Sequence, residues 1–340
     1  MKLSAFALIA ALTSAFLPTQ ASASSRYRVW QPRISGGIDT NYNDNVLGLS
    51  EPRIQLFESG AAPQQFRIHS VDDTVLRSWL QGGIASHDNE LGANLVVNTY
   101  LENSLKSSEQ LSLYAQHRLD GGDALRATYT WLRKGYAGEL ESPKTPGLIE
   151  SKFYDVHRFD SRFQHRLSER WRLTPRLAAQ LLLYDEGTSD PRTLAGAELG
   201  LATTFQPRPW LDLALDLEFE QMSALAARSD FDRSYRRYAV ELGPRFRMLG
   251  GHLVTSLLYR FAYRTYTTDN ASALDPLHRD RSDPSHRIQA RIEHSWRRVS
   301  VHLAYTRDDY RADAPGAPAL TDEEMSFARN LVSAGVGLRY

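Results

Sequence analysis

The chain has 340 residues, in which 40 Lys and Arg are balanced by 40 Asp and Glu, and it contains no cysteine. Without cysteine it can form no disulfide framework, no zinc–cysteine site and no thiol nucleophile. Its formal net charge of zero provides no overall attraction to nucleic acid or to an acidic lipid surface. We therefore expect no nucleic-acid partner, and any electrostatic function must come from how the charges are arranged.

The first 23 residues have the features of a secretory signal peptide. Lys2 supplies the positive start, an apolar run covers 3–17, and Ala21-Ser22-Ala23 forms a small-x-small cleavage site. The apolar run is shorter than the ~20 residues that a spanning helix needs, which disfavours an uncleaved anchor. No later stretch is apolar enough for such a helix, which argues against a helical inner-membrane protein. We predict a signal peptide at 1–23 and one further domain at 24–340.

Apolar and polar residues alternate from about residue 33 onward, and this period of two predicts strands with one apolar and one polar face. In the segment 210–221 the apolar face consists of Leu211, Leu213, Leu215, Leu217 and Phe219. The opposite face carries four acids, which are Asp212, Asp216, Glu218 and Glu220. Four acids on one strand face suit the wet lumen of a membrane barrel better than a soluble core.

The same alternation recurs with more basic residues in the segments 235–248, 253–263 and 286–296. Apolar residues such as Leu242 and Ile288 share the side that would face lipid. We predict that the charged residues of these segments face the lumen, namely Arg237, Glu241, Arg245, Arg247, Arg260, Arg264, Arg287, Arg291 and Glu293.

Weaker alternation continues the pattern over the rest of the chain, near 33–43, 74–85, 90–102, 109–119, 124–135, 153–166, 171–184, 193–206, 299–310 and 330–340. The segment 74–85 is ambiguous, because Leu76, Leu80 and Ile84 compete with Val75 and Trp79 for the outer face. Together the segments give about fourteen strands, an even number, as single-chain bacterial barrels require.

The predicted connections alternate in length. Short polar turns fall at 87–89, 120–123, 168–170, 206–209, 249–251 and 297–298. Longer stretches fall near 46–72, 136–152, 223–233, 267–285 and 311–328. Short turns on one side and long loops on the other are the plan of an outer-membrane barrel. We therefore predict an all-β, antiparallel, up-and-down transmembrane β-barrel in the cell outer membrane, with outer-membrane lipid against its outer face.

Aromatic residues lie near the predicted strand ends, at Trp131, Trp171, Trp210, Tyr238, Tyr263, Trp296, Tyr310 and Tyr340. Such residues suit the headgroup belts of a membrane, although aromatics also favour strands in general. In the last strand Val336, Leu338 and Tyr340 share one apolar face. A terminal aromatic with this alternation resembles the signal read by the barrel assembly machinery, which we expect as a partner.

The segment Tyr42-Asn43-Asp44-Asn45-Val46 resembles the Tyr-Asp-Asp-Asn-Val stretch in the opening strand of a family of outer-membrane β-barrel porins (porin-2-like), with one Asn in place of Asp. The run Tyr100-Leu101-Glu102-Asn103, followed by 108–113, is similar to the second hairpin of that group. The resemblance implies a barrel and a channel, in a family with some members tied to surface-polysaccharide export. It implies no named substrate.

The charged face of the late strands is the strongest functional candidate. Sequential strands are neighbours, so Glu198 and the acids of 210–221 should lie beside Arg237, Arg245 and Arg247. We expect a basic wall to continue from them through Arg260, Arg264, Arg287 and Arg291. Opposed acidic and basic walls would create a transverse field in a pore that selects solutes. The alternative is that these residues neutralise one another and fill the barrel. We predict a channel for small hydrophilic solutes or saccharides.

Other functions stay open beside the channel. A surface-polysaccharide export pore, or a binding or structural barrel that acts through the loops 46–72 and 311–328, is the main alternative. An outer-membrane hydrolase would need an acid–base or metal site, for which His278 and His286 lie near Asp269, Asp275, Asp280 and Asp283. Nothing places a nucleophile next to a base. We therefore predict no enzymatic activity, no cofactor and no metal.

Overall fold

We describe the protein from a computed structural model, in which the described residues are 30–61, 66, 68–141, 149–184, 190, 192–226, 232–271, 275, 277–315 and 325–339. The predicted signal peptide at 1–23 and the terminal residue Tyr340 lie outside these ranges. Within them, no helix has the length and apolar character needed to cross a membrane.

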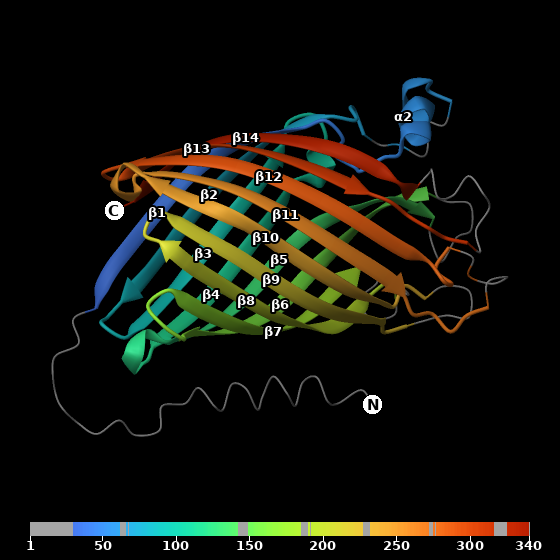
Figure 1. Cartoon of the computed structure of the whole chain (residues 1–340). Coiled ribbons are helices and arrows are strands. Elements are labelled where there is room, and N and C mark those ends of the chain that lie inside the picture. Colours follow the sequence, from blue (N-terminus) through green and yellow to red (C-terminus); the bar gives the residue numbers. More distant parts are fainter. Residues whose placement is uncertain are drawn as a thin grey trace. The chain divides into compact units, whose positions relative to one another are not determined.

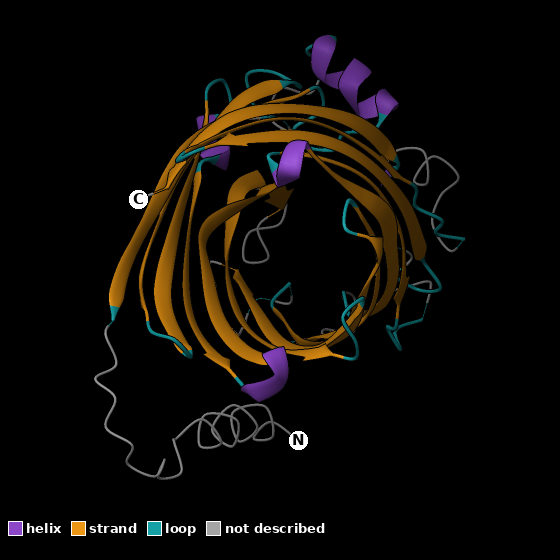
Figure 2. Ribbon diagram, turned by 60° about the vertical axis from the view of Figure 1, so that its left-hand side comes forward, coloured by secondary structure: helices purple, strands orange, loops and turns teal. Residues whose placement is uncertain are grey.

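The described chain from Gln31 onward forms a single closed sheet of fourteen antiparallel strands (Figure 1). The strands are β1 (Gln31–Asn43), β2 (Asp73–Ala85), β3 (Asn89–Tyr100), β4 (Ser108–Arg118), β5 (Ala124–Glu141), β6 (Ile149–Arg166), β7 (Trp171–Tyr184), β8 (Leu194–Arg208), β9 (Leu211–Ala224), β10 (Tyr235–Met248), β11 (Leu253–Tyr266), β12 (Ser282–Trp296), β13 (Val299–Tyr310) and β14 (Phe327–Arg339). Each strand pairs with the next in sequence, and β1 pairs with β14 to complete the ring (Figure 2). The predicted all-β barrel is confirmed.

The outer face of the barrel is apolar and exposed. Leu213 and Leu217 on β9, Leu242 on β10 and Ile288 on β12 are each 41–48% exposed. Trp171, Trp210 and Trp296 are exposed on the same face beside the short turns, as a headgroup belt requires. A continuous apolar surface around a closed sheet would be unfavourable in water and is matched by lipid. The protein is therefore an integral barrel of the outer membrane.

Two aromatic side chains, Trp79 and Tyr310, point into the barrel. The sequence left the face of Trp79 ambiguous, and our prediction of an outward Tyr310 was wrong. In β2, Leu76, Leu80 and Ile84 are exposed on the outer face, so Trp79 points inward. Its indole lies against Gly37 of β1, where a Cβ would come within 2.8 Å of the indole Nε1. Tyr310, which we predicted in a membrane belt, also points inward and donates a hydrogen bond to Asp283.

The connections alternate as predicted. The short ones are 86–88, 119–123, 167–170, 209–210, 249–252 and 297–298, and tight turns are possible there because Gly250 and Gly251 adopt positive φ of 66° and 92°. The long loop predicted at 136–152 is shorter, because β5 and β6 extend to Glu141 and Ile149. Register shifts beside Gly135 and Gly138 interrupt the period of two there, which hid the strand extension.

The first long connection, 44–72, folds on itself at the end of the barrel opposite the short turns. It carries the helix α2 (Glu51–Glu58) (Figure 1). Phe57 of this helix packs edge-on against Phe66, with 5.5 Å between the ring centroids. Lys106 in the 101–107 connection donates a hydrogen bond of 2.6 Å to the carbonyl of Val46. The two connections therefore support each other.

The porin-like motif at 42–46 holds the seam where β1 meets β14. The carboxylate of Asp44 accepts hydrogen bonds of 2.6 Å from both the backbone and the side-chain amide of Asn330. Asn45 is buried and donates to the carbonyls of Leu49, at 2.6 Å, and of Ala328, at 3.2 Å. Asp44 and Asn45 of the motif therefore tie the first strand to the last.

Candidate pore lining

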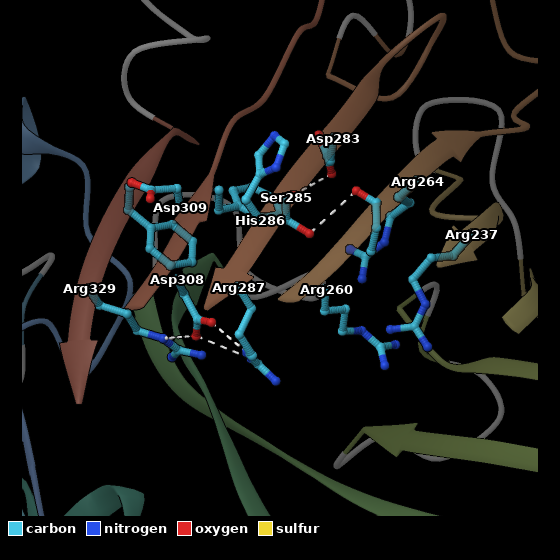
Figure 3. A pocket seen from close by; sticks show the side chains of 13 residues that line it. Arg237, Arg260, Arg264, Asp283, Ser285, His286, Arg287, Asp308, Asp309 and Arg329 are labelled. Carbon is cyan, nitrogen blue, oxygen red and sulfur yellow. Dashed lines mark hydrogen bonds and ion pairs between the residues drawn. The ribbon is translucent and has the colours of Figure 1, made fainter. Parts of the chain in front are cut away.

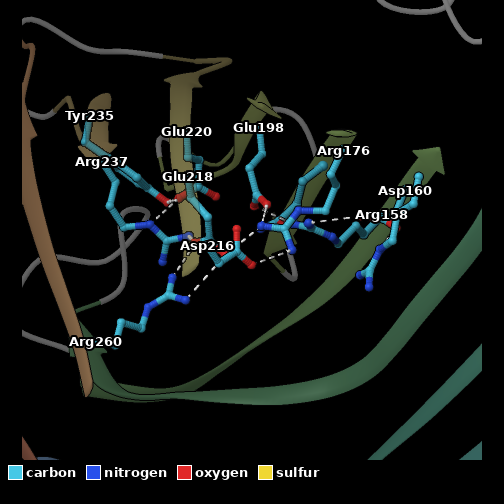
Figure 4. A network of polar contacts seen from close by, with 12 residues as sticks. Arg158, Asp160, Arg176, Glu198, Asp216, Glu218, Glu220, Tyr235, Arg237 and Arg260 are labelled. Atoms are coloured by element: carbon cyan, nitrogen blue, oxygen red, sulfur yellow. Dashed lines mark hydrogen bonds and ion pairs between the residues drawn. The ribbon is translucent and has the colours of Figure 1, made fainter. Parts of the chain in front are cut away.

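The acids predicted on 210–221 point into the barrel, where arginines from both sides pair with them (Figure 4). Glu218 is central, because it accepts from Arg176 of β7 at 2.6 Å and from both guanidinium branches of Arg260 of β11. Arg237 lies 3.0 Å from Glu220 across the β9–β10 pair. These contacts join β7, β9, β10 and β11 into one charged network.

Glu198 on β8 extends this network toward β6. Its two carboxylate oxygens lie 3.1 Å from Arg176 and 3.0 Å from Arg158. Arg176 can lie flat on the wall because Gly200 is opposite, where a Cβ would be 2.7 Å from the Arg176 Nε. Asp216 sits at the edge of the network, 3.6 Å from Arg176.

A second cluster lies on β11 to β14, around a cavity of ≈ 380 Å³ (Figure 3). Asp308 accepts hydrogen bonds from Arg287, at 2.5 Å, and from Arg329, at 2.8 Å. Arg264 stacks on the ring of Tyr235, with 4.5 Å from its guanidinium carbon to the centroid. Within the described ranges, no carboxylate forms an ion pair with Arg264.

The remaining predicted residues also face inward, with different partners. Arg247 pairs with Asp212 at 2.6 Å, although Arg245 is the residue directly opposite Asp212 in the sheet. Arg291 pairs with Glu293 on its own strand at 3.0 Å, and Glu241 lies 3.7 Å from Arg260. Arg245 is exposed, and none of the ion pairs among the described residues includes it.

The arrangement differs from the two opposed walls that we predicted. Acids and arginines lie on the same wall, because the register places opposite charges at several directly paired positions, such as Arg237 with Glu220 and Glu241 with Arg260. The three acids at the centre of the network are covered, with Glu198, Glu218 and Glu220 only 6%, 9% and 5% exposed. The arginines reach further, since Arg162 and Arg287 are 50% and 48% exposed. The most exposed charged side chains of the lining are therefore arginines.

Several charged residues of this lining were missed from the sequence. Arg158, Asp160 and Arg176 are integral to the network, and Arg77 pairs with Asp39 at 2.6 Å on the β1–β2 side. The alternation of the sequence could have identified Arg158, Asp160 and Arg176, because they share a face with other polar residues in the weaker segments 153–166 and 171–184. Their significance emerges only when the strand register brings them beside Glu198 and Glu218.

The histidine cluster proposed for an enzyme is not assembled. His286 lies on the outer face and hydrogen-bonds the hydroxyl of Tyr259 at 2.8 Å. His278 instead contacts Asp275 at 2.7 Å in the 267–281 connection. Burial lowers the pKa of His278 despite the nearby carboxylate. Among the described residues, no three His, Cys, Asp or Glu form a group that could hold a metal ion.

The other connections contain a second buried titratable group. Burial lowers the pKa of Lys106 to about 8, and the nearby positive charge of Arg329 acts in the same direction. The Lys106 ammonium lies 5.7 Å from the centroid of the Tyr100 ring. Lys106 therefore joins the 44–72 and 101–107 connections through an ammonium group whose charged form is disfavoured by burial.

No protein-family model and no curated protein matches the sequence. Solved structures of barrels are similar to it in fold. They include the outer-membrane channel DcaP of Acinetobacter baumannii, with 10% identity over 94% of this chain and 100% of that chain and a TM-score of 0.49. An anion-selective porin from Comamonas acidovorans has 10% identity over 92% and 100%, with a TM-score of 0.42. The toluene transporter TodX of Pseudomonas putida has 12% identity over 91% and 89%, with a TM-score of 0.45. At such identities the likeness is one of barrel architecture alone.

Proposed function

We propose that the protein is an outer-membrane channel through which small hydrophilic solutes, saccharides among them, diffuse, and that it favours anions over cations. The observation that carries the proposal is the unequal exposure of the lining charges. Acids such as Glu198 and Glu220 are covered by their arginine partners, whereas Arg162, Arg245 and Arg287 are exposed to the lumen. Fixed positive charge in a pore attracts anions and repels cations.

Conductance of the refolded protein in planar bilayers tests this function. Under a KCl gradient, the reversal potential should have the sign of chloride selectivity, and it should move toward potassium selectivity in Arg245→Glu. Arg133→Glu is the matched control, because Arg133 carries the same charge at an exposed position on the outer face of β5. Absence of current steps at any voltage would refute the channel. Steps with cation selectivity would refute only the anion preference.

We also propose that the chain is a member of the porin-2-like family and that the barrel assembly machinery recognises its last strand. The Tyr42–Val46 motif at the barrel seam supports the family. Val336 and Leu338 lie exposed on the outer face of β14, which supports recognition of that strand. Deletion of Tyr340 should lower the amount of assembled barrel in the outer membrane, and unchanged assembly would contradict the proposed signal.

A further inference from the structure

A second cavity, of ≈ 500 Å³, lies against the inner wall of β2 to β6, on strands that the sequence did not single out. Four uncharged side chains form a row across this wall, because the strand register places each opposite the next: Gln81, Asn94, Ser112 and Thr130. With neighbouring strands ~4.8 Å apart, the row spans about 14 Å. Such a row offers both donors and acceptors to a ligand that carries several hydroxyl groups.

Four positions along β5 from Thr130 lies Arg126, the first of three arginines that face one another across adjacent strands. Arg126 on β5 is opposite Arg162 on β6, which is opposite Arg176 on β7. Like charges at directly opposed positions destabilise a sheet. Asp160 relieves part of the repulsion through its 2.6 Å contact with Arg162, and Arg176 is neutralised by Glu198 and Glu218. Arg126 has no carboxylate partner among the residues described, and it lines the cavity together with Arg162.

The position of Arg126 is fixed by an aromatic side chain. Its guanidinium carbon lies 4.2 Å from the centroid of Tyr114, whose ring packs against Gly92 on the other side. The Tyr114 hydroxyl donates to Glu90 at 2.9 Å and accepts from Gln81 at 2.9 Å. The guanidinium is therefore held over a buried ring, where its outer edge can receive a carboxylate in a bidentate fashion.

Trp79 supplies a flat apolar surface at the same cavity. Its indole lies across Gly37 and Gly337, and any side chain at Gly37 would collide with it. The ring is partly buried and lines the cavity at the β2 end of the polar row, where it leans toward β1 and β14. An aromatic face in a wet pore suits the C–H face of a sugar ring, since one side of the ring is apolar while its edge carries hydroxyls.

From this combination we infer that the β2–β6 wall is a binding subsite for an acidic saccharide, meaning a sugar that carries a carboxylate. Trp79 stacks on one ring of an oligosaccharide, the row from Gln81 to Thr130 binds hydroxyls along it, and Arg126 with Arg162 binds its carboxylate. A simple anion would use the arginines alone, and a neutral sugar would leave them uncompensated. The inference rests on the proposed channel, whose solute class it specifies.

Block of the bilayer current by a matched pair of sugars tests the subsite. Cellobiouronic acid carries a carboxylate and cellobiose does not, while acetate has the charge without the sugar. Cellobiouronate should reduce the current at concentrations at least 10-fold below those at which cellobiose acts, and acetate should give no block. Trp79→Ala and Arg126→Gln should each raise the half-blocking concentration about 10-fold.

Arg245→Gln is the control variant, because it removes an exposed lumen arginine from β10, outside this wall, and it should leave the block within about twofold. Equal effects of Arg126→Gln and Arg245→Gln would overturn the subsite in favour of a general positive field. Equal block by acetate, or by cellobiose, would overturn the acidic-saccharide class. Calorimetric titration of the refolded protein in micelles measures the same binding without conduction. A barrel that gave no current steps but bound cellobiouronate would contradict the proposed channel and retain the subsite.

Discussion

Replacing Glu218 with glutamine should destabilise the barrel, because this one carboxylate balances arginines from three strands. It is 9% exposed, it lies 2.6 Å from Arg176, and it is held by Arg260 and approached by Arg237 at 3.9 Å. Removing one partner of a buried ion pair costs ~3–5 kcal/mol, since the other charge remains desolvated. Glutamine keeps the shape of the side chain, so the loss measures the charge.

Glu241→Gln is the matched control on the neighbouring strand. Glu241 is 32% exposed and has one distant contact, at 3.7 Å from Arg260, so its removal should cost only ~0–1 kcal/mol. Denaturant titration in micelles, with the folded fraction read from heat-modifiable gel mobility, compares the two. The free energies of unfolding should differ by at least ~2 kcal/mol. Equal stabilities of the two variants would show that the network is solvated and contributes little.

Further outcomes follow for the seam, the wall and the connections. Asn45→Ala should cost ~2–4 kcal/mol, because a buried amide loses its bonds to Leu49 and Ala328, and faster hydrogen exchange of 44–50 would report it. Gly200→Val should displace Arg176 and lower barrel stability, whereas Gly82→Val, where a Cβ would meet nothing within 4 Å, should leave stability unchanged. Burial, and then Arg233 and Arg281, lower the pKa of His278, while Asp275 acts in the opposite direction. The His278 imidazole therefore binds a proton more tightly when the 267–281 connection is unfolded than when it is folded. Acidification from pH 6.5 downward should therefore accelerate hydrogen exchange of 267–281, and His278→Gln should remove that dependence.

The barrel was predictable because apolar and polar side chains alternate along each strand, so that each strand has one apolar and one polar face. In β9 the alternation of Leu213, Asp216 and Leu217 with their neighbours gave the correct faces without knowledge of any partner. Tyr310 broke the rule for belts, because it shares parity with the inward Asp308 and finds Asp283 as its hydrogen-bond acceptor.

The pairing within the lumen was less accessible to sequence. Proximity of consecutive strands predicted that Glu220 would meet Arg237, and the two lie 3.0 Å apart. It did not predict that Arg158 would reach Glu198, two strands away. The long guanidinium side chain crosses β7, where Gln180 is opposite Arg158 and the small Ala178 is opposite Glu198. The orientation of Trp79 depended on Gly37 and Gly337, which lie on the first and last strands.

The seam also constrains the order in which the protein can fold. Asp44 and Asn330 are separated by 286 positions in sequence, yet two short hydrogen bonds join them. Bringing ends so distant together carries a length-dependent entropy cost of about 5 kcal/mol, and contacts of such range form late. Until β14 is made, Asp44 and Asn45 face an unfinished edge with donors and acceptors unused. The hydrogen bonds of Asp44 and Asn45 to the last strand therefore form only after the intervening strands have paired, and they stabilise the closed barrel rather than its precursors.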